Sequence, residues 1–133
     1  GTNKAIDATG DISMTGTHMQ THQASAPTYA YGTSISGGST PTTNTDVAGT
    51  LVLTIAASTS VPANGTLVTV SFNRSYGSAP VVVISPAGSN AQTAGSYVAS
   101  TGMTGFTIYT GPGFTSPGTA TDYTFTYYVI EAK

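Results

Sequence analysis

The chain has 133 residues, of which only three are Lys or Arg and five are Asp or Glu, and its formal net charge is -2. So few basic residues argue against a nucleic-acid partner, which needs a basic surface to displace counterions. The absence of cysteine excludes disulfides, thiolate nucleophiles and cysteine-based metal sites. No apolar run approaches the roughly 20 residues of a membrane-spanning helix, so we also expect no membrane insertion.

Residues 1–49 are poor in aliphatic side chains and rich in Gly, Thr, Ser and Pro, which predicts a linker, an extended ribbon or a long loop. Residues 37–44 are the stretch least able to fold. Within residues 10–16, glycines bracket a five-residue strand that places Ile12 and Met14 on one face. Two apolar side chains cannot hold a fold alone, so we expect neighbouring chains to supply the rest of the core. Because the chain starts without Met, we also expect a longer parent protein.

From residue 50 onward, apolar and polar residues alternate as they do in half-buried strands. The first two runs have apolar faces made of Leu51, Leu53, Ile55, Val68, Val70 and Phe72. Between these runs lie Asn64 and Gly65, a pair that accepts positive φ in tight turns. We therefore predict that the two strands form a hairpin.

Residues 81–84 differ from the other runs because they are apolar on both faces, and Pro80 and Pro86 bound them. A strand of this kind is typically covered on both sides. We expect one cover to be a second sheet and the other to be a partner chain.

Three further strands are predicted at about residues 96–101, 106–109 and 123–129. In the last of these, alternate residues form one apolar face, namely Tyr123, Phe125, Tyr127 and Val129. Six or seven short strands at this spacing predict an all-β fold, a small antiparallel β-sandwich over residues 50–133. No segment combines apolar residues at 3.6-residue spacing with caps, so we predict no helix.

Four segments in this order are similar to a known family: residues 65–72 (GTLVTVSF), 75–87 (SYGSAPVVVISPA), 105–108 (GFTI) and 123–127 (YTFTY). They resemble the C-terminal domain of many bacteriophage tail fibres and tailspikes. The resemblance covers roughly residues 50–133. It implies a homotrimeric tip of a virion fibre, which works outside the cell when the phage attaches to its host. Residues 10–16 look like the end of a fibre shaft, where three chains intertwine.

A second resemblance is to the H-type lectins, which are trimeric six-stranded sandwiches. It rests on Phe72, residues 79–82 and residues 105–108 in the same order. The final strand lacks the Trp that those lectins often have there. Neither family supplies a motif that fixes the ligand.

The two histidines, His18 and His22, are four positions apart. On a strand, this spacing points both side chains to the same face, so three chains around an axis would offer three imidazoles in each layer to a metal ion. The alternative is that both histidines are solvated in a polar ribbon. No other cofactor is expected.

Aromatic side chains on weak strands and turns are the candidate ligand-binding groups, because a ring can stack on a sugar while its hydroxyl forms hydrogen bonds. Amide and carboxylate groups in nearby turns would supply polar partners. The candidate residues are Tyr97, Tyr109, Phe114, Asn90, Gln92 and Asp122. We expect Asn90 and Gln92 to lie in an exposed loop at residues 90–95. The same Tyr residues could instead pack between subunits, and this alternative applies above all to Tyr128.

Catalysis is not expected. A hydrolase needs paired carboxylates or a nucleophile with an oriented base. Asp122 and Glu131 are an odd number of positions apart and therefore face opposite sides of the last strand. Two functions remain, a non-catalytic receptor-binding module for a host cell-surface glycan, or a structural cap that only holds the trimer together.

Overall fold

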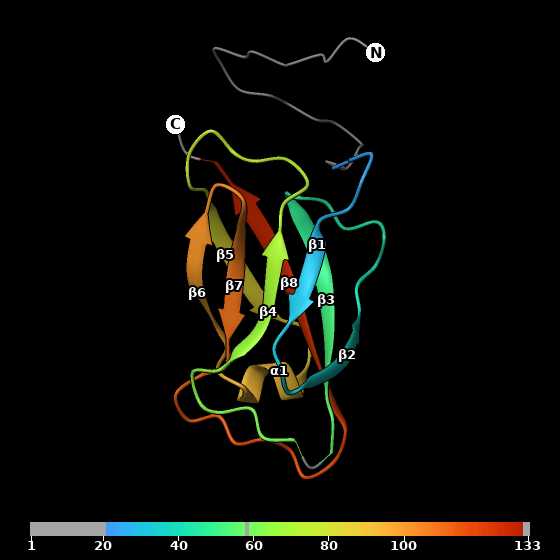
Figure 1. The fold of residues 1–133 in the computed structure, drawn as a ribbon, viewed down its shortest axis with the longest axis vertical. Coiled ribbons are helices and arrows are strands. Elements are labelled where there is room, and N and C mark those ends of the chain that lie inside the picture. The colour runs from blue at the N-terminus through green and yellow to red at the C-terminus, as the bar shows by residue number, and fades with distance from the viewer. Residues whose placement is uncertain (1–20, 58, 132–133) are drawn as a thin grey trace.

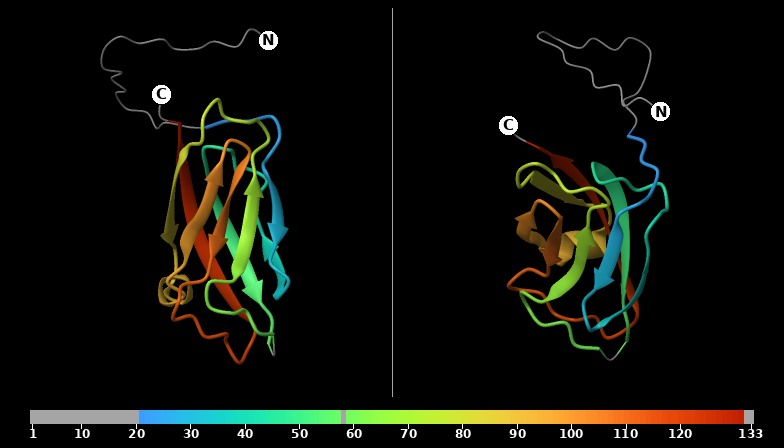
Figure 2. Two further views of the ribbon diagram at one scale, coloured as in Figure 1. Left: turned by 60° about the vertical axis from the view of Figure 1, so that its left-hand side comes forward. Right: turned by 45° about the horizontal axis from the view of Figure 1, so that its top comes forward.

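A computed structural model describes residues 21–57 and 59–131. The expected strand at residues 10–16 lies outside this part of the chain. The described residues form two antiparallel sheets of four strands each, packed face to face (Figures 1 and 2). The prediction of an all-β fold with two antiparallel layers is confirmed.

The first sheet has the strand order β1-β4-β7-β6, with β1 at Thr28–Tyr31, β4 at Thr66–Ser71, β7 at Gly105–Tyr109 and β6 at Tyr97–Gly102. The second sheet has the order β2-β3-β8-β5, with β2 at Ile35–Ser39, β3 at Ala48–Ile55, β8 at Thr121–Ile130 and β5 at Val81–Pro86.

The core lies between the two sheets and follows the predicted alternation. The side chains that β3 and β8 point inward are buried, as are those of β4 and β7 that face them: Leu51, Leu53, Ile55, Tyr123, Phe125, Tyr127, Val129, Val68, Val70, Phe106 and Ile108. Phe106 and Tyr127 join the layers, with ring centroids 5.4 Å apart. Burial of each large side chain contributes roughly 1.5–3 kcal/mol.

The predicted hairpin between residues 51–55 and 68–72 is wrong. Strand β3 pairs with β2 and β8, whereas β4 pairs with β1 and β7, so the two strands lie in different sheets. The connection between them is too long for a tight hairpin. Its Asn-Gly turn does form, since Asn64 has φ 57° and the Gly65 amide donates to the Pro62 carbonyl at 3.0 Å. This turn lies within a crossover between the sheets.

Two strands, β1 and β2, lie in the region where the sequence predicted a linker or shaft end. They are outer strands of the two sheets, so the sheets take in residues on both sides of the expected boundary between residues 49 and 50. Gly38 illustrates why this stretch looked unable to fold. A Cβ there would lie 2.5 Å from the Val52 carbonyl oxygen, so close strand packing requires the residue type that also marks flexible segments.

The prediction of no helix is also wrong, because Ser89–Thr93 form a short helix, α1. Its five residues are too few to produce a helical periodicity, and Gly88 at its N-terminus makes no side-chain cap. Ala91 and Ala94 are buried against the core. The expected loop at residues 90–95 is therefore mostly helical.

The sandwich has two distinct ends (Figure 1). The turns at residues 40–47 and 72–80 lie at one end, which we call the near end. Thr21 and Glu131 belong to this end, because Thr21 forms a hydrogen bond with Thr45 and Glu131 with Ser78. At the opposite, far end lie α1 and the connections at residues 32–34, 56–57 with 59–65, and 110–120.

Asp46 holds the turns of the near end together. Its buried carboxylate accepts hydrogen bonds from the backbone amides of Asn73 (2.8 Å) and Arg74 (3.0 Å) and from Nε2 of Gln23 (2.7 Å). The Tyr76 hydroxyl donates to the Asp46 carbonyl oxygen at 3.2 Å. A buried carboxylate costs free energy unless it is hydrogen-bonded, and this one is.

Replacing Gly105 with Ala should destabilise the fold, because the new Cβ would lie 2.2 Å from the Val70 carbonyl oxygen. We expect the free energy of unfolding to fall by about 1–3 kcal/mol. Gly37, also in a strand, is a matched control, since a Cβ there meets nothing within 4 Å. Urea denaturation would measure both variants, and equal stability of the two would contradict the prediction.

Tyr127 should make the fold sensitive to alkali. Its hydroxyl donates to the Thr45 carbonyl oxygen at 2.6 Å, and burial, followed by the neighbouring Tyr29 and Asp46, raises its pKa far above the usual range. Above about pH 10 the unfolded chain loses this proton while the folded chain keeps it, so stability falls as pH rises.

Tyr127→Phe should therefore lower stability at neutral pH by about 1 kcal/mol, through loss of the hydrogen bond. The variant should also lose less stability than the parent between neutral pH and pH values above about 10. Urea denaturation across this pH range would test both effects. An unchanged pH dependence would refute the role assigned to Tyr127.

Candidate functional site

The six residues predicted to bind a ligand all lie toward the far end of the sandwich, because they belong to elements that begin or end there. They are Tyr97 at the start of β6, Tyr109 at the end of β7, Asn90 and Gln92 on α1, Phe114 in the connection 110–120, and Asp122 near the start of β8. They form three separate groups.

Tyr97 and Tyr109 form the first group, which we call the ring pair. They lie opposite each other in the β6–β7 register, with ring centroids 6.1 Å apart and planes inclined at 64°. Tyr97 is exposed, and its hydroxyl donates to Oδ1 of Asn64 at 3.2 Å. Tyr109 is half-buried. The ring pair therefore offers an aromatic surface of fixed orientation beside an amide.

Asn90 and Asp122 form the second group. Nδ2 of Asn90 donates to the backbone oxygen of Asp122 at 3.1 Å, which ties α1 to β8. Oδ1 of Asp122 accepts from the Thr54 hydroxyl at 2.6 Å. Both side chains are exposed, as is that of Gln92 on the same helix. This group combines amide and carboxylate groups, which suit the hydroxyls of a neutral sugar.

Phe114 alone forms the third group, and its ring packs against the core. Its ring meets that of Tyr123 at 5.9 Å in an edge arrangement, and its backbone amide donates to the Gly111 carbonyl at 3.1 Å. Because the ring is half-buried, only part of it can meet a ligand. Tyr128 lies elsewhere, on the outer face of the second sheet.

The framework of the far end depends on Thr110, which the sequence did not single out. Its hydroxyl is fully buried, donates to the Pro62 carbonyl at 2.8 Å and accepts from the Gly65 amide at 3.0 Å. A second clamp joins Val61 and Ser116, whose backbone and hydroxyl groups exchange two hydrogen bonds of 2.7 and 3.1 Å. These bonds fix the turn at residues 62–65.

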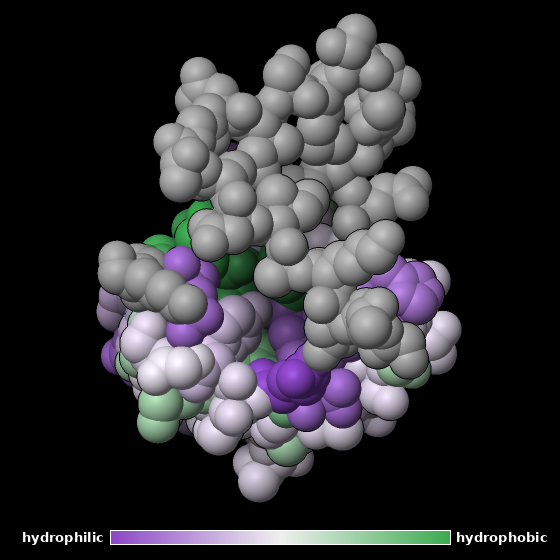
Figure 3. Space-filling model, turned by 90° about the horizontal axis from the view of Figure 1, so that it is seen from above, coloured by the Kyte–Doolittle hydropathy of each residue, from purple (hydrophilic) through white to green (hydrophobic). Residues whose placement is uncertain are grey.

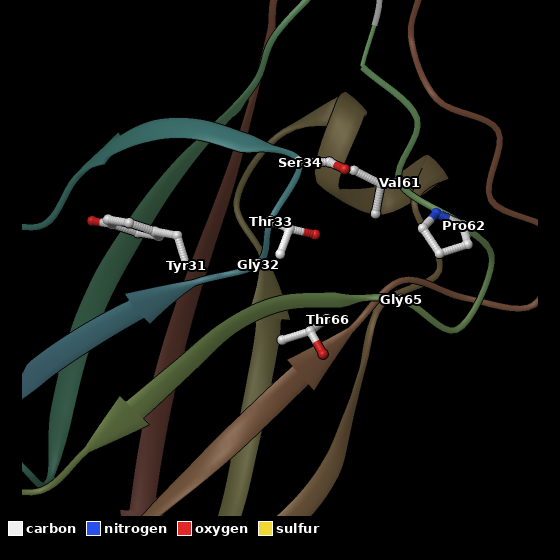
Figure 4. A pocket seen from close by; sticks show the side chains of 8 residues that line it. All are labelled: Tyr31, Gly32, Thr33, Ser34, Val61, Pro62, Gly65 and Thr66. Carbon is white, nitrogen blue, oxygen red and sulfur yellow. The ribbon is translucent and has the colours of Figure 1, made fainter.

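A hollow of about 330 Å³ opens beside this turn (Figure 4). It lies between the turn and the β1–β2 connection, and its lining residues are Tyr31, Gly32, Thr33, Ser34, Val61, Pro62, Gly65 and Thr66. Sequence reasoning missed it because half of the lining comes from the stretch predicted to be a linker. The Asn-Gly turn at residues 64–65 was the one available signal.

A second hollow, of about 560 Å³, lies at the near end and is lined by Thr21, His22, Gln23, Thr42, Thr43 and Thr45. His22 is exposed there, whereas His18 lies outside the described residues. No group of three or more His, Cys, Asp or Glu residues gathers in the described part of the chain. The proposed metal site at His18 and His22 stays a prediction.

Charged side chains are separated along the molecule. Arg74, the one Lys or Arg within residues 21–57 and 59–131, lies in the β4–β5 turn at the near end. Glu131 is also at the near end, where its Oε1 accepts from the Ser78 amide at 3.0 Å. Asp122 lies at the opposite end of β8. These two carboxylates therefore cannot act as a catalytic pair within one chain.

The outer face of the second sheet bears an exposed apolar strip next to the near end. Val81 pairs with Ile130 and Val83 with Tyr128, and their exposed fractions lie between 52% and 62%. These four residues define the apolar strip. Figure 3, a view onto the near end, shows hydrophobic residues gathered at one side of the surface.

The strip bears on the expectation that residues 81–84 are covered on both faces. Val82 and Ile84 are partly buried and pack against the core, as expected of the inner face. Val81 and Val83 are open to solvent in a single chain. Cover of this outer face by a partner chain stays a prediction.

Comparison of the chain with protein-family models, with curated protein sequences and with solved structures gave no match. Among the described residues, no helix has the length and apolar character needed to cross a membrane.

Proposed function

We propose that this chain is the tip of a bacteriophage tail fibre, a non-catalytic homotrimer whose far end binds a saccharide on the host cell surface. The observation that supports the proposal most is the difference between the two ends. The apolar strip adjoins the near end, whereas the ring pair and the exposed amides lie at the far end. A fibre tip needs this polarity, with one end for assembly and the opposite end free for a receptor.

The far end suits a saccharide because it offers rings and neutral hydrogen-bonding groups. A Tyr ring stacks on the apolar face of a sugar, and amides bond to its hydroxyls in both directions. Binding to each chain would be weak. Three copies on one tip would raise the overall affinity. Once one site is occupied, the other two meet the host surface at a high effective concentration.

The apolar strip supports self-association. Monomeric proteins rarely expose a contiguous group of large apolar side chains, and such groups commonly mark interfaces. The strip contains no charged residue, so identical strips, or a strip and another neutral surface of the same chain, can meet without burying an unpaired charge. The resemblance to tail fibres favours three copies and a place on the virion.

A structural cap without ligand binding is the second candidate, and the same strip favours it. A domain that only registers and locks three chains needs the strip and does not need the ring pair. The two candidates therefore differ in what the far end does.

The first test is saccharide binding by the far end. Fluorescently labelled protein should bind candidate host cells and saccharides on a glycan array. Tyr97→Ala or Tyr109→Ala should weaken binding roughly tenfold, because an aromatic contact contributes about 1.5 kcal/mol. Met103→Ala, which alters an exposed side chain in the β6–β7 turn, is the control. If the parent binds none of these targets while remaining trimeric, the structural cap replaces the receptor-binding proposal.

The second test is the oligomeric state. Sedimentation should show a trimer for the parent chain and a folded monomer for Val83→Asp, because the introduced charge opposes burial of the strip. The variant should keep its fold, since this side chain is 52% exposed in a single chain. Thr101→Asp, on the edge strand β6, should stay trimeric. A folded, monomeric parent would refute the assembly proposal.

A further inference from the structure

We propose that the hollow beside the turn at residues 62–65 is a subsite for a single uncharged sugar unit. This inference rests on the proposed saccharide binding and extends it to a site distinct from the ring pair. Both sites lie at the far end, on opposite sides of the same turn.

The walls of the hollow are tied together before any ligand arrives. The Gly32 amide donates to the Leu67 carbonyl at 2.9 Å, and a Cβ at Gly32 would lie 2.0 Å from the Thr66 carbonyl oxygen. The Ser34 hydroxyl donates to the Ser60 carbonyl at 2.9 Å. A preformed site avoids the entropy cost of ordering loops when a weak ligand binds.

The lining matches the two kinds of surface that a sugar ring presents. Val61 and Pro62 form an apolar wall for its C–H groups. The hydroxyls of Thr33 and Thr66 have no side-chain hydrogen bond within the described residues, and each can donate and accept. In Figure 4 the Thr33 hydroxyl points toward the side of the hollow formed by Val61 and Pro62.

The volume limits the ligand to one unit. About 330 Å³ lies at the lower limit of small-molecule sites, which span roughly 300–1,000 Å³. The other units of a longer saccharide must therefore lie outside the hollow. Its next unit can cross the turn toward the ring pair, because the turn adjoins both rings. Asn64 in that turn accepts a hydrogen bond from the Tyr97 hydroxyl, and Thr66 lies opposite Tyr109 in the β4–β7 register.

The charge distribution selects an uncharged sugar. None of the eight lining residues is charged. The described cationic and imidazole side chains, Arg74 and His22, belong to the near end. A carboxylate-bearing sugar would lose hydration in the hollow without gaining a cationic partner, which is unfavourable.

Chemical-shift mapping on the ¹⁵N-labelled chain tests the subsite directly. The probes are methyl glucoside, methyl galactoside and N-acetylglucosamine, compared with glucuronic acid and N-acetylneuraminic acid. At least one uncharged probe should shift the amide signals of Thr33, Ser34, Gly65 and Thr66. The charged probes should bind there at least tenfold more weakly.

Thr33→Val and Thr66→Val remove one hydroxyl each while preserving side-chain shape. Each should weaken binding of the active probe by about fivefold, the equivalent of one neutral hydrogen bond. Thr101→Val removes an exposed hydroxyl on β6 and should leave binding unchanged.

Three results would overturn the subsite. They are the absence of shifts around the hollow with every probe, equal binding of charged and uncharged sugars, or unchanged affinity in both Val variants. Shifts confined to Tyr97 and Tyr109 would reject the hollow and retain the proposed function. Failure of the proposed function would instead appear as an absence of cell and array binding by a trimeric parent.

Discussion

Strand β8 joins the second sheet through its backbone pairing, and its inward-facing side chains connect that sheet with the first. This strand pairs with β3 along one edge and with β5 along the other. Its Tyr127 packs against Phe106 of the opposite sheet and bonds to the backbone of the near end through its hydroxyl. Its first residues adjoin α1 through the Asn90 hydrogen bond. Loss of β8 packing would therefore separate the two sheets and release both ends.

Hydrogen bonds hold the turns together at both ends of the sandwich, and most of the groups that form them are neutral. At the near end a single buried carboxylate, that of Asp46, accepts hydrogen bonds from amide groups of two segments, Gln23 and residues 73–74. At the far end the Thr110 hydroxyl has the same role, because it binds the Gly65 amide and the Pro62 carbonyl, and none of these groups is charged. A surface of this kind discriminates ligands by hydroxyl pattern and ring shape, with little contribution from long-range attraction.

The sequence predicted the parts of the fold whose side chains alternate strongly. Residues 51–55 and 123–129 are examples, because every second residue is buried there. It did not predict β2, where Gly38 is required by close packing, nor α1, which is too short for a periodic pattern. The pairing of β3 was also missed, because the choice between two sheets depends on contacts between distant segments. The hollow was missed because half of its lining lies in the stretch predicted to be a linker.

The outer face of β8 changes character along its length, from Asp122 through Thr124 and Thr126 to Tyr128 and Ile130. Because side chains alternate between faces, inserting one residue into this strand would turn the core rings outward and the strip inward. The far-end connection at residues 112–120 is not subject to this alternation, since its residues are exposed or half-buried. Over evolutionary time, insertions and deletions should therefore accumulate in that connection and be purged from β8, so that the proposed receptor-binding end can diversify while the proposed assembly surface stays constant.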